Sequence, residues 1–180
     1  MERLKKNGNR PPRSSEIFHL VVIPVVKESP SVVAANVLSV ARNKAFARKT
    51  VIALAVEARA EQPLKEGMTR IADEFRDRFM EFLVVEHPDG LPGEARVKGA
   101  NTSYAAKAAA KYFEGKKIPF EHVIVSCFDA DTVVGPDYFA CLTYGFMNCP
   151  DRQRASFQPI PVFHNNIWEV PGFARVIETG

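Results

Sequence analysis

The amino-acid sequence predicts an α/β fold in which helices flank a mostly parallel sheet. Apolar runs at 17–26, 50–56 and 123–128 are rich in valine and isoleucine and show no polar alternation. Such runs are typical of strands that are buried on both faces. Segments with apolar residues at helical spacing lie between these runs. Strands that alternate with helices along a chain favour a parallel sheet covered on both sides.

The first strand is expected over Ile17 to Val26 and the second over Thr50 to Val56. Ser29 and Pro30 follow the first strand and are typical of a helix start, because serine can cap the free amides and proline fits the first turn. We expect this helix to reach about Phe46. Its apolar stripe consists of Val33, Val37, Val40 and Ala41.

A long amphipathic helix is predicted to begin at Pro63. Its apolar stripe consists of Leu64, Met68, Ile71, Phe75, Phe79 and Phe82. A short strand over Leu83 to Val85 should follow, and then a loop, because residues 87–97 contain two prolines and two glycines. Asn101 is expected to cap an alanine-rich helix that ends near Gly115.

The central strand of the sheet is expected over Val123 to Phe128. Because apolar residues fill most of this run, it should be buried on both faces. A helix over Asp137 to Asn148 should come next, and residues 155–163 should be extended. Pro171 opens a last segment.

Length and composition describe one globular domain behind a basic head. The 180 residues are 46% hydrophobic and 25% charged, which is ordinary for a globular chain. Residues 1–15 are polar, basic and proline-containing, so we expect a disordered head and a folded portion over 16–180. Five of the 24 basic residues lie in the first thirteen positions. The folded portion is therefore near neutral, and no nucleic-acid partner is expected.

Several protein classes are disfavoured by what the sequence lacks. No stretch approaches the roughly 18 apolar residues of a transmembrane helix. Cys127, Cys141 and Cys149 are odd in number and have no metal-ligand spacing, so reduced thiols and a cytoplasmic location are expected. Neither G-x-G-x-x-G after the first strand nor G-x-x-x-x-G-K-[ST] occurs. Dinucleotide dehydrogenases and P-loop NTPases are therefore disfavoured.

Asp129 and Asp131 follow the predicted strand 123–128 and are separated by one residue. In an extended segment, side chains two residues apart point the same way. The carboxyl ends of parallel strands are also where open α/β sheets bind ligands. Two carboxylates there suit Mg²⁺ or Mn²⁺, which takes further ligands from water and substrate phosphates. A solvated Asp-x-Asp turn is the alternative.

Further polar residues are expected at the same edge of the sheet. Glu28 follows the first strand and Glu57 ends the second, so either carboxylate could accept hydrogen bonds from a ribose or a base. Solvation of a strand end is the alternative for both. Lys98 and Asn101 open the alanine-rich helix, and a helix N-terminus favours phosphate. For Asn101, capping of that helix is the alternative.

From residue 17 to 180 the chain resembles the family 2 glycosyltransferases, which are inverting enzymes with the GT-A fold. VVIPVVKES is similar to the family's opening I-P-x-x-N-E, with Pro24 and Glu28 at the matching positions and Lys27 in place of asparagine. Glu57 in VIALAVEAR stands where the family has an acidic residue that contacts the nucleotide.

Two later segments carry the same resemblance. KGANTSYAA is similar to the family's helix start with lysine and asparagine, supplied here by Lys98, Gly99 and Asn101. FDADTVVGPDYF resembles the metal-binding D-x-D segment with its downstream proline, and its acids are Asp129 and Asp131. Each segment is a weak signal alone, and the four in this order are a strong one.

The resemblance implies transfer of a sugar from a nucleotide diphosphate donor, a UDP-sugar first among them, to an acceptor glycan or lipid. Asp131 would be the main ligand of Mg²⁺ or Mn²⁺, and Asp129 would contact the metal or the ribose. The other implied donor-nucleotide contacts are Pro24, Glu28, Glu57, Lys98 and Asn101. It further implies that the full-length protein is associated with the cytoplasmic side of a membrane.

One departure from the family affects the expected activity. The family's catalytic aspartate and the Q-x-x-R-W segment of its membrane-associated members lie downstream of the D-x-D, and neither occurs before Gly180. We therefore expect a donor-binding part of a GT-A domain, truncated at its C-terminus, in which no catalytic base is identified. A non-catalytic nucleotide-sugar-binding fragment is one alternative. A sugar-phosphate nucleotidyltransferase is another, although VVKESPS supplies Lys27 without that class's glycines.

Overall fold

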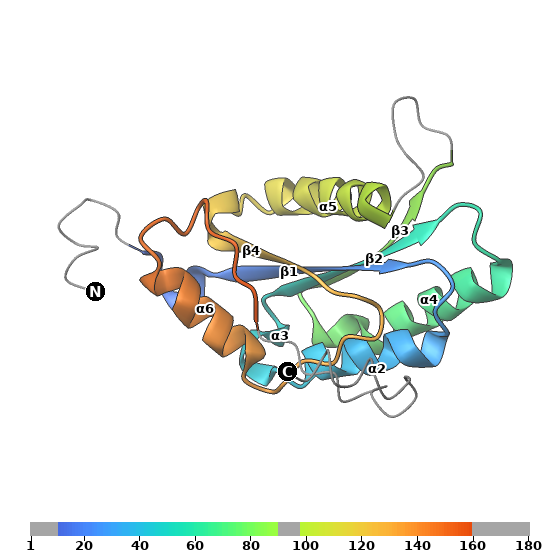
Figure 1. Ribbon diagram of the computed structural model, residues 1–180, viewed down its shortest axis with the longest axis horizontal. Helices are drawn as coiled ribbons and strands as arrows, with labels where there is room; N and C mark the ends of the chain where they lie inside the picture. Colours follow the sequence, from blue (N-terminus) through green and yellow to red (C-terminus); the bar gives the residue numbers. More distant parts are fainter. Residues whose placement is uncertain (1–10, 90–97, 160–180) are drawn as a thin grey trace, which may run out of the picture.

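The structure is a computed structural model that describes the main chain over residues 11–89 and 98–159, and side chains over 11–89 and 99–159 (Figure 1). Strands and helices alternate along it, and η denotes a short 3-10 helix. The elements are η1 (Ser14–Glu16), β1 (Phe18–Val25), α2 (Pro30–Ala41), α3 (Lys44–Ala47), β2 (Thr50–Glu57), α4 (Gln62–Phe75), η2 (Arg76–Arg78), β3 (Glu81–His87), α5 (Lys98–Gly115), η3 (Phe120–His122), β4 (Val123–Cys127) and α6 (Tyr138–Asn148).

The four strands form a single parallel sheet in the order β3-β2-β1-β4. The pairing of β1 with β2 runs as far as Val25 opposite Val56. The pairing of β1 with β4 stops earlier, at Val22 opposite Cys127. The predicted α/β fold with a parallel sheet flanked by helices is thus confirmed.

The position of β4 corrects one prediction. Within the described residues β4 lies at an edge of the sheet, and β1 and β2 occupy its middle. Ile124 and Ser126 are buried, whereas Val125 is 54% exposed, so β4 is covered on one face only. An apolar run indicates that a strand is at least partly buried, but it does not determine the strand's position in the sheet.

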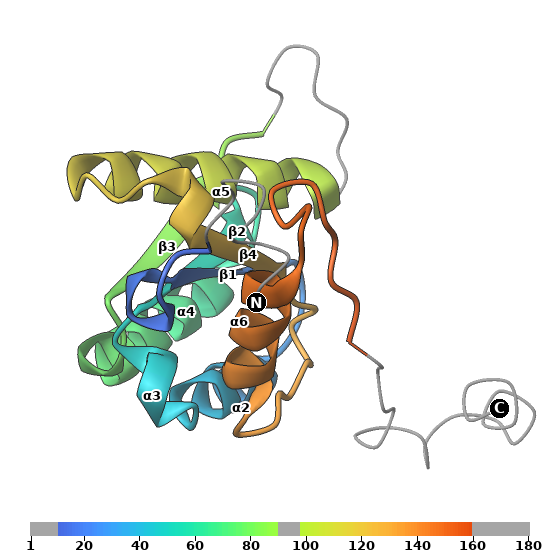
Figure 2. The same ribbon diagram turned by 90° about the vertical axis from the view of Figure 1, so that its left-hand side faces the viewer.

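Helices cover the sheet on both sides (Figures 1 and 2). α5 lies over one face, and α2, α3, α4 and α6 lie over the other. Small side chains belong to the core of the α5 face: Ala53 and Ala55 of the sheet and Ala105 and Ala109 of the helix are buried in one cluster with Leu20, Val22, Val51 and Phe113. The opposite face is filled by larger buried residues, among them Val21, Ile23, Val25, Ile52, Leu54, Met68, Phe75 and Phe139.

Two predicted helices end earlier than expected. The helix predicted from Ser29 to Phe46 breaks near Asn43 into α2 and α3. α4 ends at Phe75, so the last two residues of its predicted apolar stripe, Phe79 and Phe82, lie after η2 and in β3. Both phenylalanines are nevertheless in the core and pack against each other, with ring centroids 5.9 Å apart. The helical spacing of the buried phenylalanines therefore continues past the end of α4, which is why the sequence predicted a longer helix.

The two ends of the chain are described only in part. Of the head predicted as disordered, residues 1–10 lie outside the described part, while Ser14 and Ser15 belong to η1. The Lys49 ammonium donates to the Ser15 carbonyl at 2.7 Å and so ties η1 to the domain. The extended segment predicted over 155–163 is described as far as residue 159, and residues 155–159 have no regular secondary structure. The segment after Pro171 lies outside the described residues.

None of the helices in the described ranges has the combination of length and apolar character that a bilayer span needs.

Candidate functional site

The predicted acidic residues lie at or beyond the carboxyl ends of three neighbouring strands. Glu28 follows β1, Glu57 is the last residue of β2, and Asp129 and Asp131 follow β4. Because β2, β1 and β4 are adjacent and parallel, these ends share one edge of the sheet. The structure therefore places these acids at a common edge, as the order of elements in the sequence predicted.

Asp129 and Asp131 stand on a turn that leaves β4. The Phe128 amide still donates to the Val22 carbonyl at 3.0 Å, and the Thr132 amide donates to the Asp129 carbonyl at 3.0 Å and closes the turn. Both aspartates are exposed, while Ala130 between them is 2% exposed and belongs to the core. The segment is a turn and not the extended chain from which a common direction of the two carboxylates was predicted, so that direction stays a prediction.

Polar side chains on α2 and just after it hold this turn and the residues that follow it, and none of them was predicted from the sequence. The Asn36 amide donates to the Asp129 carbonyl at 2.9 Å and to the Ala130 carbonyl at 3.4 Å. The Ser39 hydroxyl accepts from the Val134 amide at 3.0 Å, and Asn43 donates to the Gly135 carbonyl at 3.1 Å. Buried polar residues at helical spacing beside Val33, Val37 and Val40 were the signal that could have revealed them.

Glu57 is held by side chains on either side of it. Arg59 pairs with one carboxylate oxygen, and the Asn101 amide donates to the other at 3.1 Å. The hydrogen bond from Arg59 is the largest cause that lowers the pKa of Glu57, against a smaller opposing effect of burial, and the bond from Asn101 adds to it. Glu57 is therefore a carboxylate anion at neutral pH.

Asn101 differs from its predicted role as a helix cap. α5 begins at Lys98, so Asn101 lies inside its first turn, and its side chain is 2% exposed and directed to Glu57. Two residues that the sequence predicted as separate nucleotide contacts are thus bonded to each other. Lys98 starts the helix, and its side chain lies outside the described residues.

Glu28 and Pro24 occupy the end of β1. A Glu28 carboxylate oxygen accepts from the Val26 amide at 2.7 Å and from the Lys27 amide at 3.0 Å, so Glu28 organises the turn after the strand. Pro24 is buried within β1. Residues two apart on a strand direct their main-chain polar groups to the same side of the strand. The Val22 carbonyl points toward the β4 side, where it accepts from the Phe128 amide, so an amide at position 24 would have pointed there too. β4 has already ended there, so no ladder bond is lost.

The side chains of the Asp129–Asp131 turn have the ligand chemistry that the predicted cation needs. Two exposed carboxylates supply hard oxygen ligands, which fit Mg²⁺ or Mn²⁺ when water and a diphosphate complete the shell. Across the described ranges no cluster of three or more His, Cys, Asp or Glu side chains is arranged as a closed metal cage.

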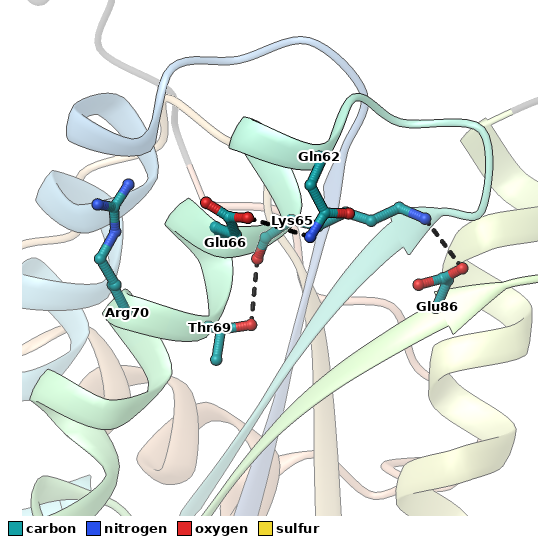
Figure 3. Close-up of a pocket in the computed structure, with 6 residues that line it drawn as sticks. All are labelled: Gln62, Lys65, Glu66, Thr69, Arg70 and Glu86. Atoms are coloured by element: carbon teal, nitrogen blue, oxygen red, sulfur yellow. Dashed lines mark hydrogen bonds and ion pairs between the residues drawn. The ribbon is translucent and has the colours of Figure 1, made fainter.

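An open pocket lies elsewhere, on the outer side of α4 near the end of β3 (Figure 3). It has a volume of about 540 Å³ and is lined by Gln62, Lys65, Glu66, Thr69, Arg70 and Glu86. The Lys65 ammonium donates to the Glu86 carboxylate at 3.0 Å, and the Gln62 amide donates to Glu66 at 3.1 Å. The pocket contains none of the predicted site residues, and β3 stands at the edge of the sheet opposite β4.

Comparison of the chain with models of known protein families and with curated proteins gave no match.

Proposed function

We propose that this chain is the donor-binding part of a metal-dependent, inverting glycosyltransferase with the GT-A fold, similar to family 2. The observation that carries the proposal is the turn after β4, on which Asp129 and Asp131 are exposed on either side of buried Ala130. Glu57 and Asn101, held together at the same edge of the sheet, support it. The resemblance of these segments to the family supports the type of reaction.

In this proposal each residue has a definite role toward a nucleotide diphosphate sugar, with a UDP-sugar as the expected donor. Asp131 is the principal ligand of Mg²⁺ or Mn²⁺, and Asp129 contacts the metal or the ribose. The bound cation would neutralise the diphosphate that leaves. Glu57, oriented by Asn101, accepts hydrogen bonds from the ribose or the base.

The remaining roles follow from the placement of β1 and α5. Glu28 orders the turn after β1 beside the nucleotide, and buried Pro24 shapes the strand end that carries this turn. Lys98, at the start of α5, would attract the diphosphate. The acceptor is a glycan or a lipid, and the full-length protein acts at the cytoplasmic side of a membrane.

A nucleotidyltransferase is disfavoured by one observation at the end of β1. Enzymes of that class need main-chain amides of a glycine-rich loop after this strand to bind phosphate. Here the Val26 and Lys27 amides both donate to the Glu28 carboxylate. These amides are therefore engaged by the chain itself.

The test is calorimetric titration with UDP in the presence and absence of Mn²⁺. We expect Asp131→Ala to abolish Mn²⁺-dependent binding of UDP without changing the melting temperature, because an exposed carboxylate contributes little to packing. Asp137→Ala is the matched control: Asp137 is an exposed carboxylate shortly downstream, and it should bind UDP as the wild type does. Unchanged binding by Asp131→Ala would refute the metal site.

A second measurement separates transfer from binding. Release of UDP from UDP-sugars in the presence of Mn²⁺ is expected if the chain is catalytically competent. Mn²⁺-dependent binding of UDP with no release from any UDP-sugar would instead support the non-catalytic nucleotide-sugar-binding alternative.

A further inference from the structure

α2 presents polar residues to the core where an ordinary amphipathic helix would present apolar ones. Asn36, Ser39 and Asn43 are 0%, 2% and 3% exposed, and they lie on or just after α2 at helical spacing. Their side chains bond the segment from Asp129 to Gly135, more than ninety residues away in the sequence. Burying amides is costly unless they are bonded, so the bonds that they make define their role.

Asn36 makes the contact that bears on the two aspartates. Its side-chain nitrogen donates to the carbonyls of Asp129 and Ala130, while its side-chain oxygen is buried without a hydrogen-bond partner. The opposite orientation of the amide would bring its oxygen against two carbonyl oxygens, which repel it. The orientation with the nitrogen toward the turn is therefore fixed by the turn.

These two carbonyls belong to the two consecutive peptide units that flank Ala130. Each peptide unit is planar, so a hydrogen bond to its carbonyl oxygen restrains the whole unit, including the Cα atoms at both its ends. One Asn36 amide thus constrains the Cα atoms of Asp129, Ala130 and Asp131 together. Each of these units is one of the two that set the direction in which the neighbouring aspartate side chain leaves the main chain.

We propose that Asn36 is a positioning residue that sets the relative direction of the Asp129 and Asp131 carboxylates for one cation. The part of this inference that concerns the cation rests on the proposed function. Groups that orient ligands without touching the metal usually change metal affinity by about 10- to 100-fold when they are removed. Asn36 acts in this way through the main chain.

Asn43 provides a matched control within the same network. It is buried to the same degree and also donates to a carbonyl of the loop, but at Gly135, and its oxygen accepts from the Phe139 amide at 3.4 Å. Loss of either asparagine removes one amide donor from a carbonyl of the loop. Of the two asparagines, Asn36 alone contacts the peptide units between the two aspartates.

The test compares Asn36→Leu with Asn43→Leu, since leucine has a similar volume and no donor. In titrations of Mn²⁺ with UDP present, we expect Asn36→Leu to weaken Mn²⁺ affinity about 10- to 100-fold, and Asn43→Leu to leave it unchanged within error. Equal affinities for the two variants would overturn the proposal, because the effect would then come from the stability of the whole loop.

Amide hydrogen exchange gives a readout that does not depend on metal. In the wild type, the Thr132 amide, which closes the turn on the Asp129 carbonyl, should be protected like the amides of α2. Asn36→Leu should speed its exchange, and Asn43→Leu should not. Fast exchange at Thr132 in the wild type would overturn the proposal, even if neither variant folds.

The two readouts also separate this inference from the proposed function. If the wild type binds neither Mn²⁺ nor UDP, the proposed function fails. The exchange of Thr132 in the two variants still decides whether Asn36 fixes the turn.

Discussion

The two faces of the sheet hold their parts of the candidate site in different ways. On the α2 face, buried side chains bond the main chain of the turn that carries Asp129 and Asp131. On the α5 face, the buried Asn101 amide bonds the carboxylate of Glu57 itself. Replacing an aspartate should therefore leave its turn in place, whereas replacing Glu57 leaves an interior amide without its acceptor. Under the proposed function, ligand binding and stability would be separable on the first face and coupled on the second.

The packing of the two faces differs in the same sense. The α2 face combines large apolar side chains with buried polar groups, including His19, Asn36 and Asn43. Four of the eight buried residues of the α5 face are alanines, and these small side chains let the helix lie close to the sheet. The first face should therefore be sensitive to changes that affect polar groups, and the second to changes in volume.

The largest expected effect is that of acid on the α2 face. His19 is fully buried, and its ring lies 5.4 Å from that of Phe46 and 4.8 Å from that of Phe139. Burial, and second the charge of Lys49, lower its pKa from 6.5 to about 3. The unfolded chain takes up this proton near pH 6.5 and the folded chain does not. Stability is therefore complete above that pH and falls by about 1.4 kcal/mol per pH unit below it, or about 3 kcal/mol from pH 7 to pH 4.

Urea denaturation of the wild type and of His19→Phe at several pH values measures this effect. Phenylalanine keeps a ring between Phe46 and Phe139 but cannot be protonated, so the variant should lose stability much less steeply on acidification. The Thr143 hydroxyl, 3.0 Å from the histidine nitrogen, loses its partner equally at every pH. Parallel pH profiles for the two proteins would show that His19 does not carry the effect.

The second effect is expected on the α5 face, from volume alone. Ala109 is fully buried against the sheet. Ala109→Leu should destabilise the fold by about 2 kcal/mol, because a closely packed site cannot accept the larger side chain without displacement of the helix. Ala108→Leu, at a half-buried position of the same helix, should change stability by less than about 0.5 kcal/mol. Chemical denaturation measures both, and equal stabilities would show that α5 does not lie close to the sheet.

The sequence predicted those features that depend on local chemistry. Val-rich and Ile-rich runs predicted the strands, and Pro30 predicted the start of α2, where Ser29 occupies the N-cap position without a side-chain capping bond. The parallel order then implied that Glu57 and the two aspartates share one edge, as they do.

The features that the sequence did not predict depend on packing between distant segments. The position of β4 at the sheet edge, the end of α4 at Phe75 and the contact of Asn101 with Glu57 have no local signal. The roles of Asn36 and Asn43 were overlooked because asparagine in a helix is ordinarily an exposed residue. Their spacing along the apolar stripe of α2 was the only sign that they face the core.

A third and smaller effect is expected where α4 crosses α2. A Cβ at Gly67 would lie 2.5 Å from Cγ of Pro30, which is part of a rigid ring at the start of α2. The helix propensity gained by alanine is about 1 kcal/mol, and overpacking costs about 1–3 kcal/mol. Gly67→Ala should therefore destabilise the fold by about 1 kcal/mol.

Gly145→Ala is the control for this prediction. A Cβ there would lie 3.7 Å from the Phe157 ring, which is an ordinary contact. This variant should keep the gain in helix propensity and be as stable as the wild type or slightly more so. Thermal unfolding of the two variants measures the difference, and a stabilised Gly67→Ala would mean that α4 and α2 are farther apart than the structure shows.

The smallest effect concerns the charge of Glu57 and tests the α5 face most directly. Because the Arg59 hydrogen bond is the largest cause that lowers the pKa of Glu57 and the Asn101 bond is a further one, Arg59→Leu and Asn101→Leu should each raise that pKa. The rise should be greater for Arg59→Leu. Titration of the side-chain carboxyl carbon by NMR measures it, with Lys116→Leu, just after the C-terminal end of α5, as the unaffected control. A rise in Arg59→Leu alone would show that Asn101 orients Glu57 without stabilising its charge, and the two faces would then differ less than their contacts suggest.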